Sequence, residues 1–449
     1  MGNKMKKFIT LLAITSLFIG CEIDEDLNDN PNAFTDAPIG LIINHALLNV
    51  AAVAEAAPAR ITSMFTDQLT GFDRQYATWN IYSVNSNSYN ETWSDGLAAG
   101  VSQAQVAKAK AVEAGNAQIQ GIAEILEGYY FAETALVFGD IPFSEVNSLD
   151  FPDPVYESQA TVMNGAIALI QSGIQKAGSV SAANNVFSTS STWSQIGNAL
   201  LARYNLAMGN NSAALAAAKA ANFTSTANDW DIIHTTTNYM ENLFWMFEVE
   251  ERQDYLRVQN SYMSDLINPA SSIYSGNAKT DESGRFAWYV DQSNGVSMNT
   301  TDGFAAVDRN YPVVSFEEVQ LIIAETAVGT SPDEALAALN AVRASNNSKY
   351  GGNFDAYTTA DFAAGGMVNR GLSTSAAMTM EIMIEKFKSV IGGPTYHDVR
   401  RNNNLIGTRV KNTNTNVIPQ RFFYPASESS SNENFPGLID QFVKVPIFN

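Results

Sequence analysis

The chain has 449 residues, 45% of them hydrophobic, and carries a formal charge of −20 from 46 acidic and 26 basic side chains. The hydrophobic content suffices for a large core. The acidic excess disfavours nucleic acid and anionic membrane surfaces as partners, because both are bound through clustered Lys and Arg.

The first twenty residues have the pattern of a secretory leader. A basic stretch over residues 4–7 precedes an apolar run over residues 8–19, and Gly20 provides the small side chain before a cleavage site. The run is shorter than the roughly 20 residues that span a bilayer, so we expect residues 1–20 to be removed. Cys21 then becomes the first residue of the mature chain.

Cys21 is the only cysteine in the sequence. A cysteine in this position accepts the diacylglyceryl lipid of bacterial lipoproteins, whose two or three acyl chains give a stable anchor. Residues 17–20 depart from the usual pattern before such a cysteine only at Phe18, where leucine is preferred. We expect a lipid on Cys21 and a tether over residues 21–39; the alternative is an unpaired thiol in the core.

Seven segments carry apolar residues three and four positions apart and are rich in alanine, which predicts helices. They are residues 40–56, 97–114, 116–138, 158–177, 191–221, 315–346 and 375–391. The segments 199–220 and 321–342 share a plan of helix, tight turn and helix. The pattern therefore indicates an all-α fold with tetratricopeptide-like packing of degenerate repeats.

Long polar stretches that contain many aromatic residues separate the helical segments. Loops of such length in a compact protein are usually functional or disordered. Because no low-complexity linker divides the chain, we expect one domain over residues 40–449, in which a helical scaffold carries a lobe of loops. The scaffold covers roughly 40–71, 97–221, 313–346 and 375–403, and the loop lobe roughly 72–96, 222–312 and 347–374.

Motifs for catalysis, metals and cofactors are missing from the sequence. Three histidines far apart and no second cysteine give little support to a zinc site, and no nucleophile elbow, phosphate-binding loop, dinucleotide fingerprint or calcium loop occurs. We expect no cofactor, no metal and no catalytic residue. A glycosidase needs only two carboxylates, but its candidates have the context of solvated faces: Glu124, Glu127, Glu248, Glu250 and Glu251.

Two polar segments, residues 72–93 and 285–294, contain aromatic residues more often than a solvated linker does. Sugars are recognised by flat rings that stack on their C–H faces and by polar side chains that bind their hydroxyls. The alternative is that the rings attach the loops to the scaffold, which we favour for Trp93. The expected platforms are Tyr76, Trp79, Tyr82, Trp288 and Tyr289, and their expected polar partners are Arg74, Asn80 and Asp291.

Four short signatures follow one another along the chain. They are Asn30-Pro31-Asn32 after Leu27; Phe138-Gly139-Asp140-Ile141-Pro142 at the end of the helix from Ala123; Glu385-Lys386 followed by Tyr396-His397-Asp398-Val399-Arg400-Arg401; and Pro419-Gln420-Arg421-Phe422-Phe423-Tyr424-Pro425 with Glu428 and Asn432. Together they resemble the SusD/RagB family of lipoproteins, nearly end to end. We expect these residues to be scaffold, because the glycan-binding loops of that family have no fixed motif.

The resemblance implies a function without chemistry. A member of this family is a lipid-anchored protein on the outer face of the outer membrane, where it binds polysaccharide or oligosaccharide and delivers it to a SusC-like TonB-dependent transporter. The acidic residues 22–26 resemble surface-export signals of Bacteroidetes lipoproteins. Two alternatives stay open: a surface scaffold that binds peptide or protein through its helical repeats, and, more distantly, a glycoside hydrolase.

Overall fold

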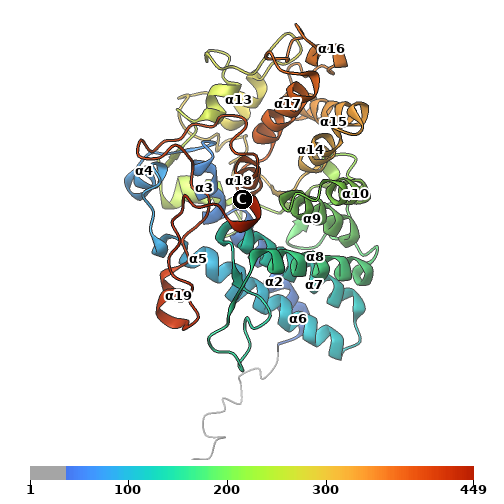
Figure 1. Cartoon of the computed structure of the whole chain (residues 1–449), viewed down its shortest axis with the longest axis vertical. Coiled ribbons are helices and arrows are strands. Elements are labelled where there is room, and N and C mark those ends of the chain that lie inside the picture. The colour runs from blue at the N-terminus through green and yellow to red at the C-terminus, as the bar shows by residue number, and fades with distance from the viewer. Residues whose placement is uncertain (1–36) are drawn as a thin grey trace, which may run out of the picture. The chain divides into compact units, whose positions relative to one another are not determined.

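The computed structural model describes residues 37–449 and is mostly helical (Figure 1). Ile42–Asn449 form one compact unit, and the N-terminal unit before it ends at Leu41. The expected leader, the lipid-accepting Cys21 and the tether as far as residue 36 lie outside the described residues.

Two helices, α2 (Ile39–Ala54) and α3 (Ala57–Phe65), open the described chain. By length and composition the stretch Ile39–Phe65 could cross a membrane. The two helices are separate, however, because the helical conformation is interrupted at Glu55 and Ala56. Pro58 then lies in the first turn of α3. The fully buried Glu55 carboxylate accepts the Leu243 N–H at 2.8 Å, and seven of the nine residues of α3 are buried. These helices therefore belong to the protein core.

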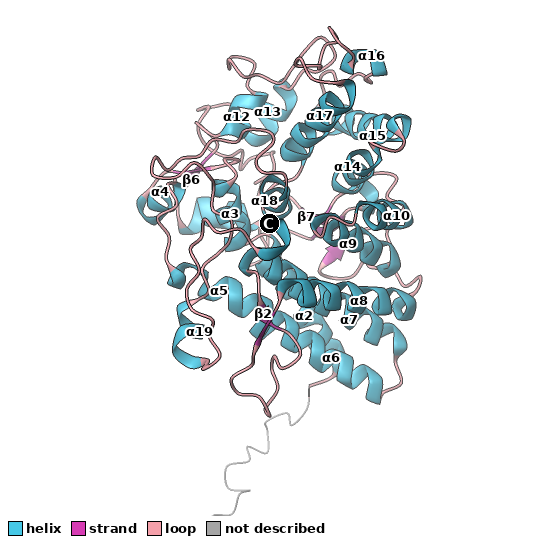
Figure 2. Ribbon diagram, viewed as in Figure 1, coloured by secondary structure: helices cyan, strands magenta, loops and turns pink. Residues whose placement is uncertain are grey.

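The scaffold continues as a series of helices in which each packs against the next. Figure 2 shows α6, α7 and α8 side by side, with α9 and α10 following. Side-chain caps fix their starts: Asn116 accepts the Ile119 N–H at 3.1 Å, and the Thr192 hydroxyl accepts the Gln195 N–H at 3.3 Å. The helices are η4 (Ser94–Val101, a π-helix), α6 (Ser102–Glu113), α7 (Ala117–Phe138), α8 (Gln159–Ala177), α9 (Trp193–Ala207) and α10 (Asn211–Ala221).

A second group of helices adds to this series through a contact between α10 and α14. The helix α14 in turn packs against α15 and α17. The group consists of α14 (Phe316–Ala327), α15 (Pro332–Tyr350), α17 (Thr374–Ser389) and α18 (Gly393–Arg401). The predicted all-α scaffold of paired helices is confirmed.

Short elements make up much of the remaining chain, including the segments predicted as loops, which are therefore more regular than the sequence indicates. The short helices are α4 (Arg74–Asn80), η3 (Ser86–Tyr89), α5 (Asn90–Trp93), η5 (Thr226–Asn228), α11 (Leu243–Trp245), η6 (Met246–Glu251), α12 (Tyr262–Ile267), α13 (Ser283–Tyr289), α16 (Thr359–Phe362), α19 (Ala426–Ser431) and η7 (Pro446–Phe448). The antiparallel strand pairs are β1 (Thr70–Gly71) with β6 (Leu256–Arg257), β2 (Ile141–Pro142) with β3 (Tyr156–Glu157), and β5 (Trp230–Ile232) with both β4 (Phe187–Ser188) and β7 (Tyr311–Val314).

The last signature of the sequence attaches the C-terminal segment to the end of α7. Arg421 donates to the Phe138 carbonyl, and the Tyr424 hydroxyl donates to the Asp140 carbonyl at 2.7 Å. Glu428 accepts the indole N–H of Trp93 at 3.1 Å and the hydroxyl of Tyr156 at 2.7 Å. These residues connect distant segments and, as expected, act as scaffold.

The signature on α18 makes a second buried attachment. Arg401 pairs with Asp398 at 2.7 Å and with Glu325 of α14 at 2.6 Å. Arg400 has no carboxylate partner among residues 37–449 and instead donates to the main-chain carbonyls of Gln420 and Leu136, at 2.8 and 2.9 Å. Charge-assisted bonds of this kind make burial of the guanidinium groups tolerable.

Candidate functional site

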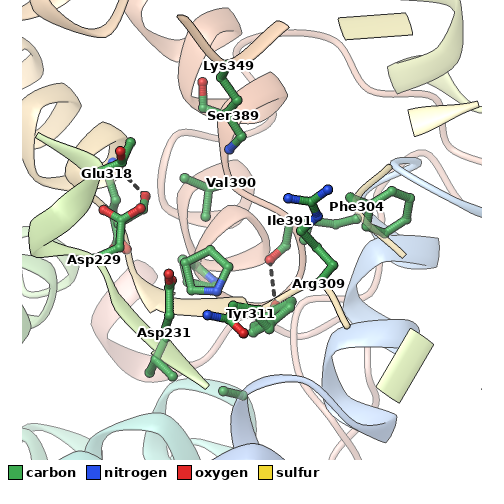
Figure 3. A pocket seen from close by; sticks show the side chains of 18 of the residues that line it. Asp229, Asp231, Phe304, Arg309, Tyr311, Glu318, Lys349, Ser389, Val390 and Ile391 are labelled. Carbon is green, nitrogen blue, oxygen red and sulfur yellow. Dashed lines mark hydrogen bonds between the residues drawn. The ribbon is translucent and has the colours of Figure 1, made fainter. Parts of the chain in front are cut away.

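A cavity of about 530 Å³ lies where the scaffold helices meet the region predicted as loop lobe (Figure 3). Its walls come from the end of α2, from α7 and α9, from β5 and β7, from α13, from the end of α15 and from the connection between α17 and α18. A volume of this size is in the range of small-ligand sites. The cavity is therefore the candidate binding site.

One wall is a closed network around Arg203 of α9. Its guanidinium binds both carboxylate oxygens of Glu318 at 2.7 Å and one oxygen of Glu133 at 3.0 Å. Burial raises the pKa of Glu133, but the hydrogen bond from His397 and the charge of Arg203 outweigh it and lower the pKa to about 2. These groups satisfy one another, so this wall is structural.

A second wall carries two carboxyl groups, one on β5 and one on the residue directly before it. Asp229 and Asp231 are two positions apart and line the cavity on the same side (Figure 3). Asp229 accepts the Phe316 N–H at 2.6 Å, whereas no side-chain hydrogen bond of Asp231 occurs within residues 37–449. Burial, followed by the charges of Glu317 and Asp231, raises the pKa of Asp229. Burial also raises the pKa of Asp231 to about 7, against the opposing effect of Lys349.

The third wall combines aromatic rings with two cations. Trp288 on α13 is half-buried; the Arg309 guanidinium carbon lies 4.4 Å from its ring centroid, and the Lys349 ammonium nitrogen lies 5.7 Å from it. The neighbouring Tyr289 donates its hydroxyl to the Lys388 carbonyl at 3.1 Å. Figure 3 shows Arg309 across the cavity from Asp229 and Asp231, with Lys349 at the top of the view between the two sides. The site thus has a basic aromatic side and an acidic side.

Two of the eight ligand-binding residues predicted from the sequence line this cavity, namely Trp288 and Tyr289. Tyr289 is only 4% exposed, however, so of the two only Trp288 offers a ring to a sugar. Asp291 lies just after α13 but not in the cavity lining. Its carboxylate accepts the Ser293 N–H at 2.8 Å and the Asn294 amide at 2.9 Å, so it shapes a turn.

The other five predicted residues lie on and next to α4, outside the cavity lining. Tyr76 and Tyr82 are only 3% and 2% exposed, so their rings offer no open face to a sugar, in contrast to the expected platform role. Asn80 accepts hydrogen bonds from Lys411 at 2.8 Å and from the Gly71 N–H at 3.0 Å. Arg74 is exposed, and Trp79 is half-buried against the core.

The tyrosines near α4 have structural partners. The ring centroids of Tyr76 and Phe247 lie 5.0 Å apart, with the two rings tilted. The Tyr76 hydroxyl accepts a hydrogen bond from Arg60 at 3.2 Å. The Tyr82 hydroxyl accepts the Lys411 N–H at 3.0 Å. The rings of this segment therefore attach the chain to the scaffold, which is the alternative that the sequence left open. Trp93, 6% exposed, is core as predicted.

Of the five carboxylates considered for hydrolysis, Glu250 and Glu251 are exposed, as expected of a solvated face. The other three are buried, in contrast to that expectation, and have partners. Glu124 pairs with Lys176, Glu127 pairs with Lys108, and Glu248 accepts the Asp254 N–H at 2.7 Å. Over residues 37–449, no group of three or more His, Cys, Asp or Glu side chains is arranged to hold a metal.

Four residues of the cavity lining were not predicted from the sequence: Asp229, Asp231, Arg309 and Lys349. The two aspartates flank Trp230 in an alternating pattern that marks a short strand with one polar face. That signal was available in the sequence. Arg309 and Lys349 carry no local signal, because a single cation in a loop or at a helix end resembles any solvated residue.

Comparison with known proteins assigns the family. Residues 31–425 match the SusD-like family model described as "Starch-binding associating with outer membrane". No curated protein matches the chain by sequence.

Solved structures agree in fold. A SusD/RagB family protein from Bacteroides thetaiotaomicron superposes with a TM-score of 0.63 at 16% identity, over 89% of this chain and 95% of that one. A chitin-binding SusD homologue from Flavobacterium johnsoniae superposes with a TM-score of 0.66 at 15% identity, over 92% and 98% of the two chains. Because the family model covers most of the sequence, the protein belongs to the SusD/RagB family, as its four signatures predict.

Proposed function

We propose that the protein binds an oligosaccharide in the cavity beside Trp288 and delivers it to a TonB-dependent transporter of the outer membrane. The observation that carries the proposal is the cavity itself: an aromatic ring and unshared polar groups surround about 530 Å³ in a chain whose family is described as starch-binding. The half-buried indole suits the C–H face of a sugar, and Asp231, Lys349 and Arg309 suit its hydroxyls.

Binding is tested by calorimetry of the purified protein against a panel of oligosaccharides that includes starch and chitin oligomers. Loss of one stacking ring is worth about 0.5–1.5 kcal/mol, so Trp288→Ala should weaken binding about 2- to 13-fold. Trp79→Ala is the matched control, because Trp79 is also half-buried but lies outside the cavity lining. Equal affinity of Trp288→Ala and the unmodified protein would contradict this site, and loss of binding only in Trp79→Ala would move the site to α4.

A binding role without catalysis is the second part of the proposal. Members of this family are generally non-catalytic binding proteins, and the cavity carboxylates Glu133 and Glu318 are both committed to Arg203. Incubation with each bound oligosaccharide should leave its length unchanged. Release of new reducing ends would instead support the glycoside hydrolase alternative.

The third part concerns attachment to the membrane. A lipid on Cys21 would hold the protein at the outer membrane, where the transporter lies. Cys21→Ala should move the protein from the membrane fraction to the soluble fraction in cells that express it. Retention of the variant in the membrane would contradict lipidation at this residue.

A further inference from the structure

We propose that the cavity prefers sugars that carry a negatively charged group, a carboxylate or a sulfate ester, which Arg309 and Lys349 bind beside Trp288. The inference rests on the proposed carbohydrate-binding function and specifies the class of sugar.

The first argument is that these two cations have no carboxylate partner. The chain has 46 acidic residues for 26 basic ones, so cations are expected to find partners. Some enclosed cations do so: Lys388 pairs with Glu282 at 2.5 Å, and Arg203 pairs with Glu318 at 2.7 Å. The buried Arg400 instead donates to the main-chain carbonyls of Gln420 and Leu136. No carboxylate of residues 37–449 lies within ion-pair distance of Arg309 or Lys349, although both line a cavity.

The second argument is that Arg309 is held in place with part of its guanidinium unused. Its Nε donates to the Gly303 carbonyl at 3.2 Å and its Nη2 donates to the Asp302 carbonyl at 3.0 Å. Nη1 makes no hydrogen bond to the described part of the chain, and the group lies over the Trp288 ring. A guanidinium fixed in this way loses little freedom on binding and can grip a carboxylate or sulfate with its free N–H groups.

Lys349, the last residue but one of α15, also lines the cavity. Its ammonium group forms no hydrogen bond within residues 37–449 and lies near the rings of Trp288 and Tyr350, at 5.7 and 5.4 Å. Two cations therefore border one aromatic surface. A ring that stacks there would place a substituent anion within reach of both.

Acidic groups in and near the cavity repel an anionic sugar, but their hydrogen bonds and protonation limit this repulsion. Asp229 already accepts the Phe316 N–H, and Glu317 accepts the Ser345 hydroxyl at 2.8 Å. Burial raises the pKa of Asp231 to about 7, so this carboxyl is partly protonated at neutral pH and can donate a hydrogen bond to an oxygen-rich ligand. Asp308 is exposed.

The test compares pairs of ligands that differ only in charge. Calorimetry of the full chain in detergent would use oligogalacturonate against its neutral methyl ester, and a sulfated galactan oligomer against its desulfated form. We expect the charged member of at least one pair to bind about tenfold or more tightly than the neutral member, with a preference that falls as salt rises. The pair that shows the preference identifies the anion.

Substitutions connect the preference to the two cations. Arg309→Gln and Lys349→Gln should each reduce the charged-over-neutral ratio several-fold, because the glutamine amide can still hydrogen-bond a hydroxyl group but carries no charge. Lys219→Gln is the control, because Lys219 is exposed on α10 and the charge change is the same. Thermal melts check that each variant is folded. Arg309→Gln removes the hydrogen bonds of Arg309 to the main chain, whereas Lys349→Gln leaves them intact and changes an exposed residue.

Three results would overturn the inference. Equal binding of both members of each pair, or a preference that survives both substitutions, would refute it while carbohydrate binding stands. Absence of binding to every carbohydrate, charged or neutral, would refute the proposed function together with it.

Discussion

Gly128 of α7 lies at a close approach of α7 and α8, and its replacement by alanine tests that contact. A Cβ atom at this position would lie 2.6 Å from the Ala166 carbonyl oxygen and 2.7 Å from the Ile170 side chain. The backbone oxygen cannot rotate away, so the two helices must separate. Overpacking of this kind costs about 1–3 kcal/mol, and the higher helix propensity of alanine returns about 1 kcal/mol.

We expect Gly128→Ala to lose up to about 2 kcal/mol of stability after these two effects are combined. In a unit of this size, with an unfolding entropy of about 0.9 kcal/mol per kelvin, that corresponds to a fall of up to about 2 °C in the melting temperature, followed by circular dichroism. Gly329→Ala is the matched control: no atom lies within 4 Å of its added Cβ, so its melting temperature should stay the same or rise slightly. A Gly128→Ala variant that melts at or above the temperature of the unmodified protein would refute the close approach of α7 and α8.

Two further predictions concern buried charges. Arg203→Met should cost about 3–5 kcal/mol, because it leaves the Glu318 carboxylate buried and unpaired; a loss below about 1 kcal/mol in urea unfolding would contradict the network. Burial lowers the pKa of His234, but the Glu55 carboxylate 2.7 Å from its Nε2 outweighs this and raises the pKa. This pair therefore stabilises the fold fully below the unfolded pKa of about 6.5 and loses its effect as pH rises through the higher folded value. The unmodified protein should melt at a higher temperature than His234→Asn, and this difference should become smaller from about pH 6 upwards. His45→Gln is the control, because His45 is exposed. A difference that does not change with pH would contradict the pairing.

The helical scaffold was predictable because its signals are local. Residues 116–138 and 158–177 were predicted as helices, and α7 and α8 cover Ala117–Phe138 and Gln159–Ala177. The apolar spacing and the capping residues that determine these helices lie within the segments themselves. α18 lies within the predicted scaffold range 375–403, but the periodic pattern stops at residue 391, because α18 is short and polar and begins after Gly392, whose φ of 87° is set by the turn.

The site was predictable only in part, because its residues come from distant segments. Trp288 and Tyr289 were found as aromatic residues in a polar stretch, and they line the cavity. Tyr82 gives the same local pattern but is buried, because its hydroxyl meets the Lys411 backbone 329 residues later. Local composition does not distinguish a ring that faces a cavity from one that faces the core. Only the tertiary fold brings Lys349 to Trp288.

The attachment of the first helices to the last third of the chain has a consequence for the order of folding. Gln68 donates to the Phe387 carbonyl across 319 residues, and the Phe422 N–H donates to the Val137 carbonyl at 2.8 Å. At about 5–20 residues per second a ribosome needs on the order of 15–60 s to make the intervening chain. During that time the part of α3 that packs against α18 has no permanent cover, and closing so long a loop is entropically costly and slow. Such a chain completes its fold only after synthesis has ended, which suits passage across a membrane in the unfolded state.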